Sequence, residues 1–266
     1  MMLPDCQTLA LDFDKGVLYL TFNRPKARNA MSRQMVEEMQ SVFSIIDGDS
    51  TCRAVVLRGA EGFFCAGGDI KDMAMARGSA QAVTELNRLF GTVITQLDQL
   101  SQTVVAVVEG AAMGGGFGLV CVADVVLAHG EAKMALPETS LGIPPAQIAP
   151  FLVRRLGLFR ARRLALTGAK IRGVKLREEG LADEVYETTE ELDKGLDELL
   201  KKIMRCGPNA SAITKRLLNS VHGTDLEQLL DDAASSFAES VLSPEGMEGT
   251  MAFISRKSPS WAKDWH

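Results

Sequence analysis

The chain has 266 residues, of which 46% are hydrophobic and 24% are charged, and its formal net charge is −5. This composition is typical of a globular protein with one domain and an appendage, or with two small domains. The acidic balance argues against a general nucleic-acid binder, which is usually basic. We see no basic and apolar leader at the N-terminus and no uncharged apolar run of the ~20 residues that a membrane span takes. We therefore expect a cytoplasmic protein without a membrane partner.

The first 190 residues alternate between strand and helix patterns. Residues 8–25 predict a β-hairpin with its turn at 14–16, and residues 31–47 predict a helix with Ser32 as its N-cap. Further strands are expected at 53–59, 103–110, 124–128, 132–138 and 182–187, and helices from Ile70, over 80–100, from the glycines at 114–116 and from about 146 onward. The alternation predicts an α/β core. We expect a core of residues 1–195 and a helical C-terminal segment of residues 196–266.

Two segments share a design in which an apolar strand leads through a loop to glycines and then to a helix. They are residues 54–73 and residues 103–120. Backbone N–H groups at a helix start lack an intrahelical partner and carry partial positive charge, so they bind anions. Glycine lets a ligand oxygen approach that backbone because no Cβ intervenes. The alternative is that the glycines only allow tight turns or close packing, but two matched segments favour a binding role.

A dinucleotide site does not fit the second segment. The motif Gly-x-Gly-x-x-Gly fails because Leu119 or Cys121 stands where its last glycine is required. A phosphate-binding loop would need Gly-Lys-Ser/Thr, which the sequence lacks. What remains is an oxyanion hole made of two backbone N–H groups, each worth roughly 3 kcal/mol in a transition state.

Glu138 is the candidate acid–base group. It follows a short predicted strand, and Met134, Leu136, Leu141 and Ile143 around it are apolar. Apolar surroundings raise the pKa of a carboxyl group and suit it to general acid–base catalysis. The alternative is that Glu138 caps the following helix or faces water.

Five segments, taken in order, resemble the signature segments of the enoyl-CoA hydratase/isomerase (crotonase) superfamily. They are NRPKARNAM (23–31), FCAGGDIKDM (64–73), EGAAMGGGFGLVCVADVVLA (109–128), LPETSLGIPPA (136–146) and EGTMAFISRKSPSW (248–261). The resemblance implies an α/β fold, the ClpP-like crotonase spiral of ββα units followed by a helical trimerisation segment. It also implies a homotrimer, or a homohexamer made from two trimers. The implied activity is that of an acyl-CoA lyase, which needs no metal or redox cofactor because CoA enters as part of the substrate.

The resemblance also assigns roles to single positions. The N–H groups of Gly68 and Gly115 would hold the thioester oxygen, and Glu138 would deliver or remove the Cα proton. CoA would contact two loops of its own subunit and an aromatic and a basic residue of a neighbouring subunit. The implied CoA positions are Lys26, Ala27, Arg28, Ala66, Gly67, Asp69, Ile70, Lys71, Phe253 and Arg256.

Gly118 departs from the pattern of typical hydratases, which have a second glutamate here that helps to hold the attacking water. Members with one glutamate include enoyl-CoA double-bond isomerases and hydratases of branched, carboxylated enoyl-CoAs. Residues 114–124 and 137–169 are most similar to members that hydrate isohexenylglutaconyl-CoA, and less to those that hydrate methylglutaconyl-CoA. The missing side chain at Gly118 would leave room for a substituent at C3 of the substrate. We therefore predict that the enzyme hydrates its substrate, and the alternative is that it isomerises the double bond.

Three further features have plainer interpretations. The first is a group of arginines, which we expect to form a solvated helix face. The alternatives are that they bind a distal carboxylate of the substrate or form an RNA-binding patch. They stand at positions 154, 155, 160, 162 and 163. An RNA-binding patch would fit a third hypothesis for the function, in which the chain is a non-catalytic relative that binds RNA or acyl-CoA. Cys65 has no histidine near it in the sequence and is expected to be a small buried hydrophobe. The five cysteines contain no Cys-x-x-Cys, and His129, His222 and His266 form no cluster, so no metal site is expected.

Overall fold

The computed structural model describes residues 2–76, 78–221 and 223–265. Its strands are β1 (Leu9–Asp14), β2 (Val17–Phe22), β3 (Ala54–Gly59), β4 (Thr103–Val108), β5 (Ala111–Met113), β6 (Val125–His129), β7 (Lys133–Ala135), β8 (Lys170–Arg172) and β9 (Glu184–Tyr186). Its α-helices are α1 (Arg33–Ile46), α2 (Ile70–Ala76), α3 (Ala80–Gln99), α4 (Gly115–Val122), α5 (Ala149–Thr167), α6 (Lys175–Glu178), α7 (Thr189–Arg205), α8 (Pro208–Asn219), α9 (Leu226–Leu242) and α10 (Pro244–Ile254). Short 3₁₀ helices are η1 (Pro25–Ala27), η2 (Ala60–Gly62), η3 (Glu138–Leu141) and η4 (Ser260–Ala262).

Two sheets organise these elements. The larger sheet has the order β1-β2-β3-β4-β6-β9, and the smaller has the order β5-β7-β8. In the larger sheet only β1 and β2 pair antiparallel. The units β4–β5–α4 and β6–β7–α5 each place one strand in the larger sheet, the next in the smaller sheet, and then a helix. The predicted α/β spiral of ββα units is therefore confirmed.

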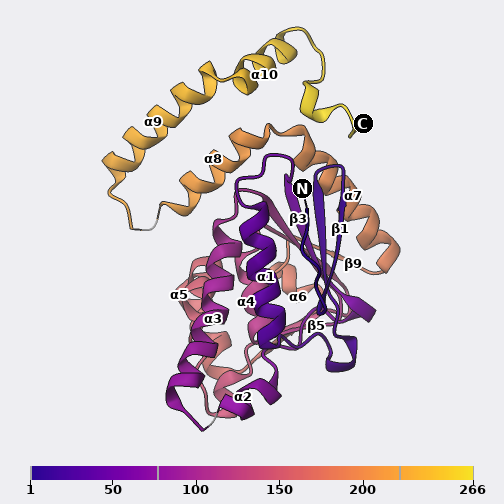
Figure 1. Cartoon of the computed structure of the whole chain (residues 1–266), viewed down its shortest axis with the longest axis vertical. Helices are drawn as coiled ribbons and strands as arrows, with labels where there is room; N and C mark the ends of the chain where they lie inside the picture. Colours follow the sequence, from indigo (N-terminus) through magenta and orange to yellow (C-terminus); the bar gives the residue numbers. More distant parts are fainter. Residues whose placement is uncertain (1, 77, 222, 266) are drawn as a thin grey trace.

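The central strands of the larger sheet are buried on both faces. In β3, Val55 and Leu57 belong to the apolar cluster that includes α1 and α3, whereas Ala54 and Val56 belong to the cluster that includes α7. Figure 1 shows α1 and α3 on one side of this sheet and α7 on the other. Burial on both faces explains why the parallel strands read as almost continuous apolar runs in the sequence.

Most predicted elements form close to their expected bounds. The hairpin turns between Asp14 and Val17, and the Ser32 hydroxyl accepts a hydrogen bond from the Met35 N–H (3.2 Å) at the start of α1. The strands β5 and β8 were not predicted. Each has only three residues, and each is held by its pairing with β7 rather than by a pattern of its own.

The C-terminal segment is helical, as expected, but its first helix packs on the sheet. The expected boundary between residues 195 and 196 falls inside α7, whose Leu192 and Leu200 are fully buried against the larger sheet. The division into a core and an oligomerisation segment stays a prediction. The next helix, α8, is tied to the core by Lys215, whose ammonium group lies 2.7 Å from the Asp124 carboxylate.

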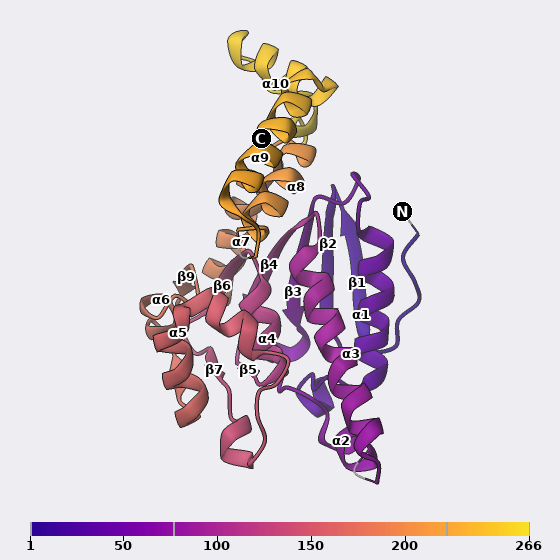
Figure 2. The same cartoon turned by 90° about the vertical axis from the view of Figure 1, so that its left-hand side faces the viewer.

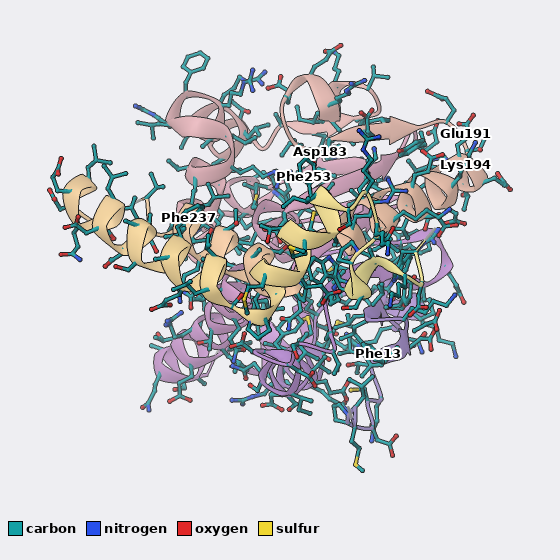
Figure 3. The ribbon with its side chains drawn as sticks, turned by 90° about the horizontal axis from the view of Figure 1, so that it is seen from above. Phe13, Asp183, Glu191, Lys194, Phe237 and Phe253 are labelled. Atoms are coloured by element: carbon teal, nitrogen blue, oxygen red, sulfur yellow. The ribbon has the colours of Figure 1, made fainter. Side chains whose placement is uncertain are left out.

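The helices α9 and α10 form an arm that extends beyond the two sheets (Figure 2). The arm leaves large apolar side chains exposed, namely Leu226, Leu230, Phe237, Val241, Leu242, Met247, Met251, Phe253 and Ile254. Figure 3 shows Phe237 on α9 and Phe253 on α10, above the sheets. An exposed apolar surface of this extent is typical of an interaction site.

The packing of α7 can be tested with two leucine substitutions. Leu200→Ala removes a side chain that is 0% exposed, and we expect it to lower the free energy of unfolding by about 2–5 kcal/mol. The control is Leu166→Ala on α5, where the leucine is 68% exposed and the expected change is within about 0.5 kcal/mol. Urea unfolding of both variants measures this difference, and equal losses would contradict the burial of α7.

Candidate active site

The first glycine loop is fixed so that the N–H group of Gly68 stays free. The Met31 N–H donates to the Gly67 carbonyl (2.8 Å), and the Asp69 N–H donates to the Met31 carbonyl (2.9 Å). Because these parallel-type bonds use the residues on both sides of Gly68, its own N–H points away from Met31. Among the described hydrogen bonds, the Gly68 N–H has no acceptor.

The second glycine loop lies against the first. Gly114 donates its N–H to the Ala135 carbonyl (3.0 Å), and α4 begins at the next residue. A Cβ atom built on Gly67 would lie 3.0 Å from the Met113 carbonyl oxygen and 3.7 Å from the Gly115 nitrogen. Within the described part of the chain the Gly115 N–H, like that of Gly68, has no acceptor. The structure thus places the two glycine loops against each other with both N–H groups free, and the oxyanion role that the resemblance implies for Gly68 and Gly115 stays a prediction.

Each of the three successive glycines stands where a side chain would collide with a neighbouring group. Gly114 has φ +50°, and a Cβ atom there would lie 2.7 Å from Glu138 Oε1. A Cβ on Gly115 would overlap the end of the Met31 side chain, and one on Gly116 would lie 2.7 Å from the Cβ of Cys65. The glycines therefore let α4, the first loop and the glutamate approach one another closely.

Glu138 begins η3, three residues after the end of β7, and its carboxylate lies over Gly114. Its Oε2 atom is buried and has no hydrogen-bond partner among the described residues, which favours the acid–base interpretation over a carboxylate that faces water. Burial raises the pKa of this carboxyl group, and a hydrogen bond from its own backbone N–H offsets only part of that effect. The prediction that four apolar residues surround Glu138 is only half right. Met134 and Leu136 are buried, but Leu141 and Ile143 are 69% and 43% exposed.

The two loops predicted to hold CoA lie beside the oxyanion hole and contact each other. Lys26 and Ala27 lie in η1 and Arg28 follows it, and the Ala66 N–H donates to the Arg28 carbonyl (3.1 Å). The side chains of Lys26, Arg28, Ile70 and Lys71 are exposed, as is Ala66, whereas Gly67 and Asp69 are buried. A ligand in this place would meet cationic side chains above a fixed backbone.

Asp69 holds this backbone rather than facing a ligand. Its carboxylate lies 2.9 Å from the Arg24 guanidinium and accepts a hydrogen bond from the Lys71 N–H (2.9 Å). Burial alone would raise the pKa of Asp69, but these two hydrogen bonds lower it below its ordinary value. The loop is therefore anchored by an ionised carboxylate at neutral pH.

Sequence analysis missed Asn29, which ties the same loops together. It is buried with φ +55°, and its amide donates to the Phe63 and Ala60 carbonyls, the latter at 3.1 Å. Its side-chain oxygen accepts a hydrogen bond from the Arg24 N–H (2.9 Å). Asparagine tolerates left-handed backbone better than most residues, so its place in NRPKARNAM was a usable signal.

A cationic cavity next to the first loop was also missed. It has a volume of about 230 Å³ and adjoins both glycine loops at Ala66 and Met113. Its charged lining residues are Arg28, Lys133, Lys170 and Arg172, and no acidic residue lines it among the described residues. The last three stand on β7 and β8, so only the pairing of these short strands brings them to the site.

Phe253 and Arg256 do not reach this site within one chain. They lie in and just after α10, at the opposite end of the molecule from α2 (Figures 1 and 2). Phe253 is 85% exposed there. The structure therefore leaves their predicted role to a neighbouring subunit.

The expectation that Gly118 leaves room for a substrate substituent is wrong. Gly118 is buried, and a Cβ atom there would lie 3.0 Å from both Ile94 Cδ1 and Ile148 Cγ1. The space beside the glycine is thus filled by two apolar side chains. Gly118 therefore has no free space beside it, and a glycine at this position supplies no second carboxylate.

The arginines at 154–163 are mostly engaged with acidic groups. Arg154 pairs with Asp98, Arg155 lies 3.7 Å from Asp183, and Arg160 and Arg163 both contact Glu179. These pairs favour a structural helix face over a carboxylate ligand or an RNA patch.

Cys65 is a buried residue, as predicted. Burial raises the pKa of its thiol to about 12, so it is not a nucleophile at neutral pH. Of the three histidines, His222 and His266 lie outside the described residues. Within the described ranges no group of three or more His, Cys, Asp or Glu side chains could hold a metal ion. No described helix is long and apolar enough to span a bilayer.

A ββα spiral in which two glycine loops with free N–H groups adjoin one partly buried carboxylate has the groups that acyl-CoA chemistry requires. The chain belongs to the enoyl-CoA hydratase/isomerase family, which matches residues 12–264, and it is an enoyl-CoA hydratase-type lyase of the crotonase superfamily.

Three relatives illustrate this similarity. The solved structure of Pseudomonas aeruginosa AtuE is 52% identical with a TM-score of 0.95, covering 96% of this chain and all of that one. Carnitinyl-CoA dehydratase of Proteus mirabilis is 33% identical over 96% of this chain and 98% of its own. Mitochondrial methylglutaconyl-CoA hydratase of Mus musculus is 28% identical over 93% of this chain and 80% of its own.

The raised pKa of Glu138 predicts a pH-dependent gain in stability on replacement by glutamine. An acid with a raised folded-state pKa binds its proton more tightly when folded, so the folded state loses stability as pH rises through that pKa. We expect Glu138→Gln to have a higher Tm than wild type at about pH 8, and the difference to vanish below about pH 4.

The control for this prediction is Glu131→Gln, at an exposed glutamate in the loop before β7. Because this side chain is exposed, we expect the substitution to change the Tm little. Calorimetry from acid to neutral pH measures both variants, and a Glu138→Gln variant less stable than wild type at neutral pH would contradict the desolvation of this carboxylate.

Proposed function

We propose that the chain adds water across the C2=C3 double bond of a branched glutaconyl-CoA, such as isohexenylglutaconyl-CoA or methylglutaconyl-CoA. The observation that carries the reaction type is the single desolvated carboxylate of Glu138 beside the free N–H groups of Gly68 and Gly115. The similarity to a methylglutaconyl-CoA hydratase supports the substrate class. The filled space at Gly118 means that the acyl branch has to lie elsewhere in the site.

One carboxylate can serve both proton transfers of a hydration. Glu138 takes a proton from water as the water oxygen bonds to C3, and the electron pair of the double bond moves through C2 to the thioester oxygen. The N–H groups of Gly68 and Gly115 stabilise this enolate oxygen, each by roughly 3 kcal/mol. Glu138 then returns the proton to C2, and the product is a 3-hydroxyacyl-CoA. The raised pKa suits a group that must both accept and donate a proton near neutral pH.

CoA enters as part of the substrate, and the proposed reaction uses no further cofactor. Its backbone-binding positions are Lys26 to Arg28 and Ala66 to Lys71. In this proposal the exposed basic residues around the adjoining cavity, Lys133, Lys170 and Arg172, supply the positive charge that the phosphates of CoA require. We propose a cytoplasmic location because the described cysteines are all unpaired, which fits a reducing compartment.

Double-bond isomerisation is the second candidate. It needs the same oxyanion hole and the same base, and the apolar side chains of Ile94 and Ile148 beside Gly118 favour a site that holds no additional water there. An isomerase would move a proton along the acyl chain without consuming water.

The reaction can be tested by following the absorbance of the conjugated enoyl-thioester of isohexenylglutaconyl-CoA. We expect wild type to remove this absorbance and to incorporate ¹⁸O from labelled water into the product. Glu138→Gln should lower kcat by about 10²–10⁴-fold, because it removes the proton carrier. A double-bond shift without ¹⁸O uptake would assign the chain as an isomerase and reject the proposed hydration.

We further propose that the chain is a homotrimer or a hexamer of two trimers, in which α10 brings Phe253 and Arg256 to a neighbour's CoA. The exposed apolar side chains of α9 and α10 support this assembly. A hexamer would have six times the chain mass of 28.7 kDa in light scattering. Phe253→Ala should raise KM about tenfold and leave kcat within twofold, as expected for lost ground-state binding. A fully active monomer would contradict this arrangement.

A further inference from the structure

Three cationic side chains stand on one face of the antiparallel pair formed by β7 and β8. The register sets Lys133 directly opposite Arg172, and Lys170 stands two residues before Arg172 on β8. Because side chains alternate along a strand, these three residues share one face, and all three are exposed. Met134 and Ile171, which pair with each other, are buried on the other face. The smaller sheet thus presents a cationic face to solvent and an apolar face to the core.

No acidic side chain neutralises this cationic face within the described residues. Like charges directly opposite each other in a sheet are destabilising, so the pairing of Lys133 with Arg172 costs stability. Arg28 adds a further cation to the cavity that these residues line. None of the four cations forms an ion pair with a described residue, whereas most arginines of α5 do. An unpaired cationic cluster in a chain of net charge −5 favours an anionic ligand.

The rest of the cavity is apolar and adjoins both glycine loops. Its uncharged lining residues are Phe63, Ala66, Gly110, Ala111 and Met113. Ala66 stands two residues before Gly68 in the first loop, and Met113 stands two residues before Gly115 in the second. A ligand that reaches these loops can therefore place an anionic group against the cations without leaving the cavity.

Backbone hydrogen bonds fix the cationic strands to the floor of the cavity. The Lys133 N–H donates to the Gly110 carbonyl (2.7 Å), and Lys133 pairs with Ala111 between β7 and β5. The Gly173 N–H donates to the Ala132 carbonyl (3.2 Å), which continues the pairing of β8 with β7. The backbone under the cations is therefore in place before a ligand binds, and only their side chains have to be ordered.

We propose that Lys133, Lys170 and Arg172 bind the 3′-phosphate of CoA. A terminal phosphate monoester carries about two negative charges near neutral pH, more than either phosphate of the pyrophosphate bridge, and it suits a cluster of several unpaired cations. β5 and β7 lie in the core, far from α10 of the same chain (Figure 2), so this contact does not depend on Phe253 or Arg256. The proposal rests on the proposed function for the identity of the ligand as CoA, and it adds which phosphate the subunit binds by itself.

The test measures the binding of free CoA and of 3′-dephospho-CoA by titration calorimetry, which requires no turnover. We expect wild type to bind CoA about tenfold or more tightly than dephospho-CoA, as hydrogen bonds to charged groups predict. The double variant Lys170→Gln/Arg172→Gln should lose this preference, because its affinity for CoA falls while its affinity for dephospho-CoA stays within about twofold of wild type. Lys170→Arg keeps the charge and should keep the preference.

The matched control is the double variant Lys201→Gln/Lys202→Gln on α7. Both lysines are exposed, and α7 lies on the face of the larger sheet opposite α1 and α3, away from the cavity. The control removes the same net charge, so a preference that it leaves within about twofold of wild type assigns the effect to the local contact. A loss of preference equal to that of the β8 variant would overturn the proposal.

The other outcomes separate this proposal from the proposed function. Equal affinities of wild type for CoA and dephospho-CoA would overturn the 3′-phosphate site and leave the hydration of an acyl-CoA standing. An equal loss of both ligands in Lys170→Gln/Arg172→Gln would place the pyrophosphate against the cations and would also overturn it. Failure of wild type to bind either ligand would reject the use of CoA, and both proposals with it.

Discussion

The candidate site depends on one close approach between two stretches of backbone. A Cβ atom on Gly67 of the first loop would lie only 3.0 Å from the Met113 carbonyl oxygen, and Gly67 also has φ +98°, so glycine suits this position. The approach sets the spacing of the two free N–H groups, and Gly114 leaves the adjacent space for the carboxylate of Glu138. Fixed dipoles of this kind need no reorganisation when negative charge develops, which is why such sites stabilise enolates well.

Hydrogen bonds and one ion pair between buried or partly buried polar groups hold the glycine loops in this arrangement. Asn29 and the Arg24–Asp69 pair connect the loops around residues 24–30, 60–63 and 66–71. A buried network of this kind is stable only when its members are satisfied, and unpaired groups in it are costly. By contrast, Oε2 of Glu138 is one of four buried side-chain atoms without a partner in the described structure, and its carboxylate lies over Gly114, next to the free N–H group of Gly115.

The sequence predicts those parts of the molecule that depend on local patterns. The hairpin, the Ser32 cap, the glycine-led helix α4 and the partly buried carboxylate of Glu138 all follow from residue type and spacing. Gly118 shows where such reasoning stops, because the absence of a side chain says nothing about which distant residue fills the space. Ile148 reaches Gly118 only through tertiary packing, and the cations of β7 and β8 reach the site only through the pairing of three-residue strands.

The register of β5 against β7 determines both where Glu138 lies and whether Met134 is buried. Ala112 pairs with Met134, and the next bond of the same ladder joins the Gly114 N–H to the Ala135 carbonyl, three residues before Glu138. A slip of one residue would move Glu138 by about 3.3 Å along the strand and turn alternate side chains to the opposite face. It would carry Met134 out of the core. A misregistered, inactive chain would therefore also expose apolar surface, which makes the error unstable.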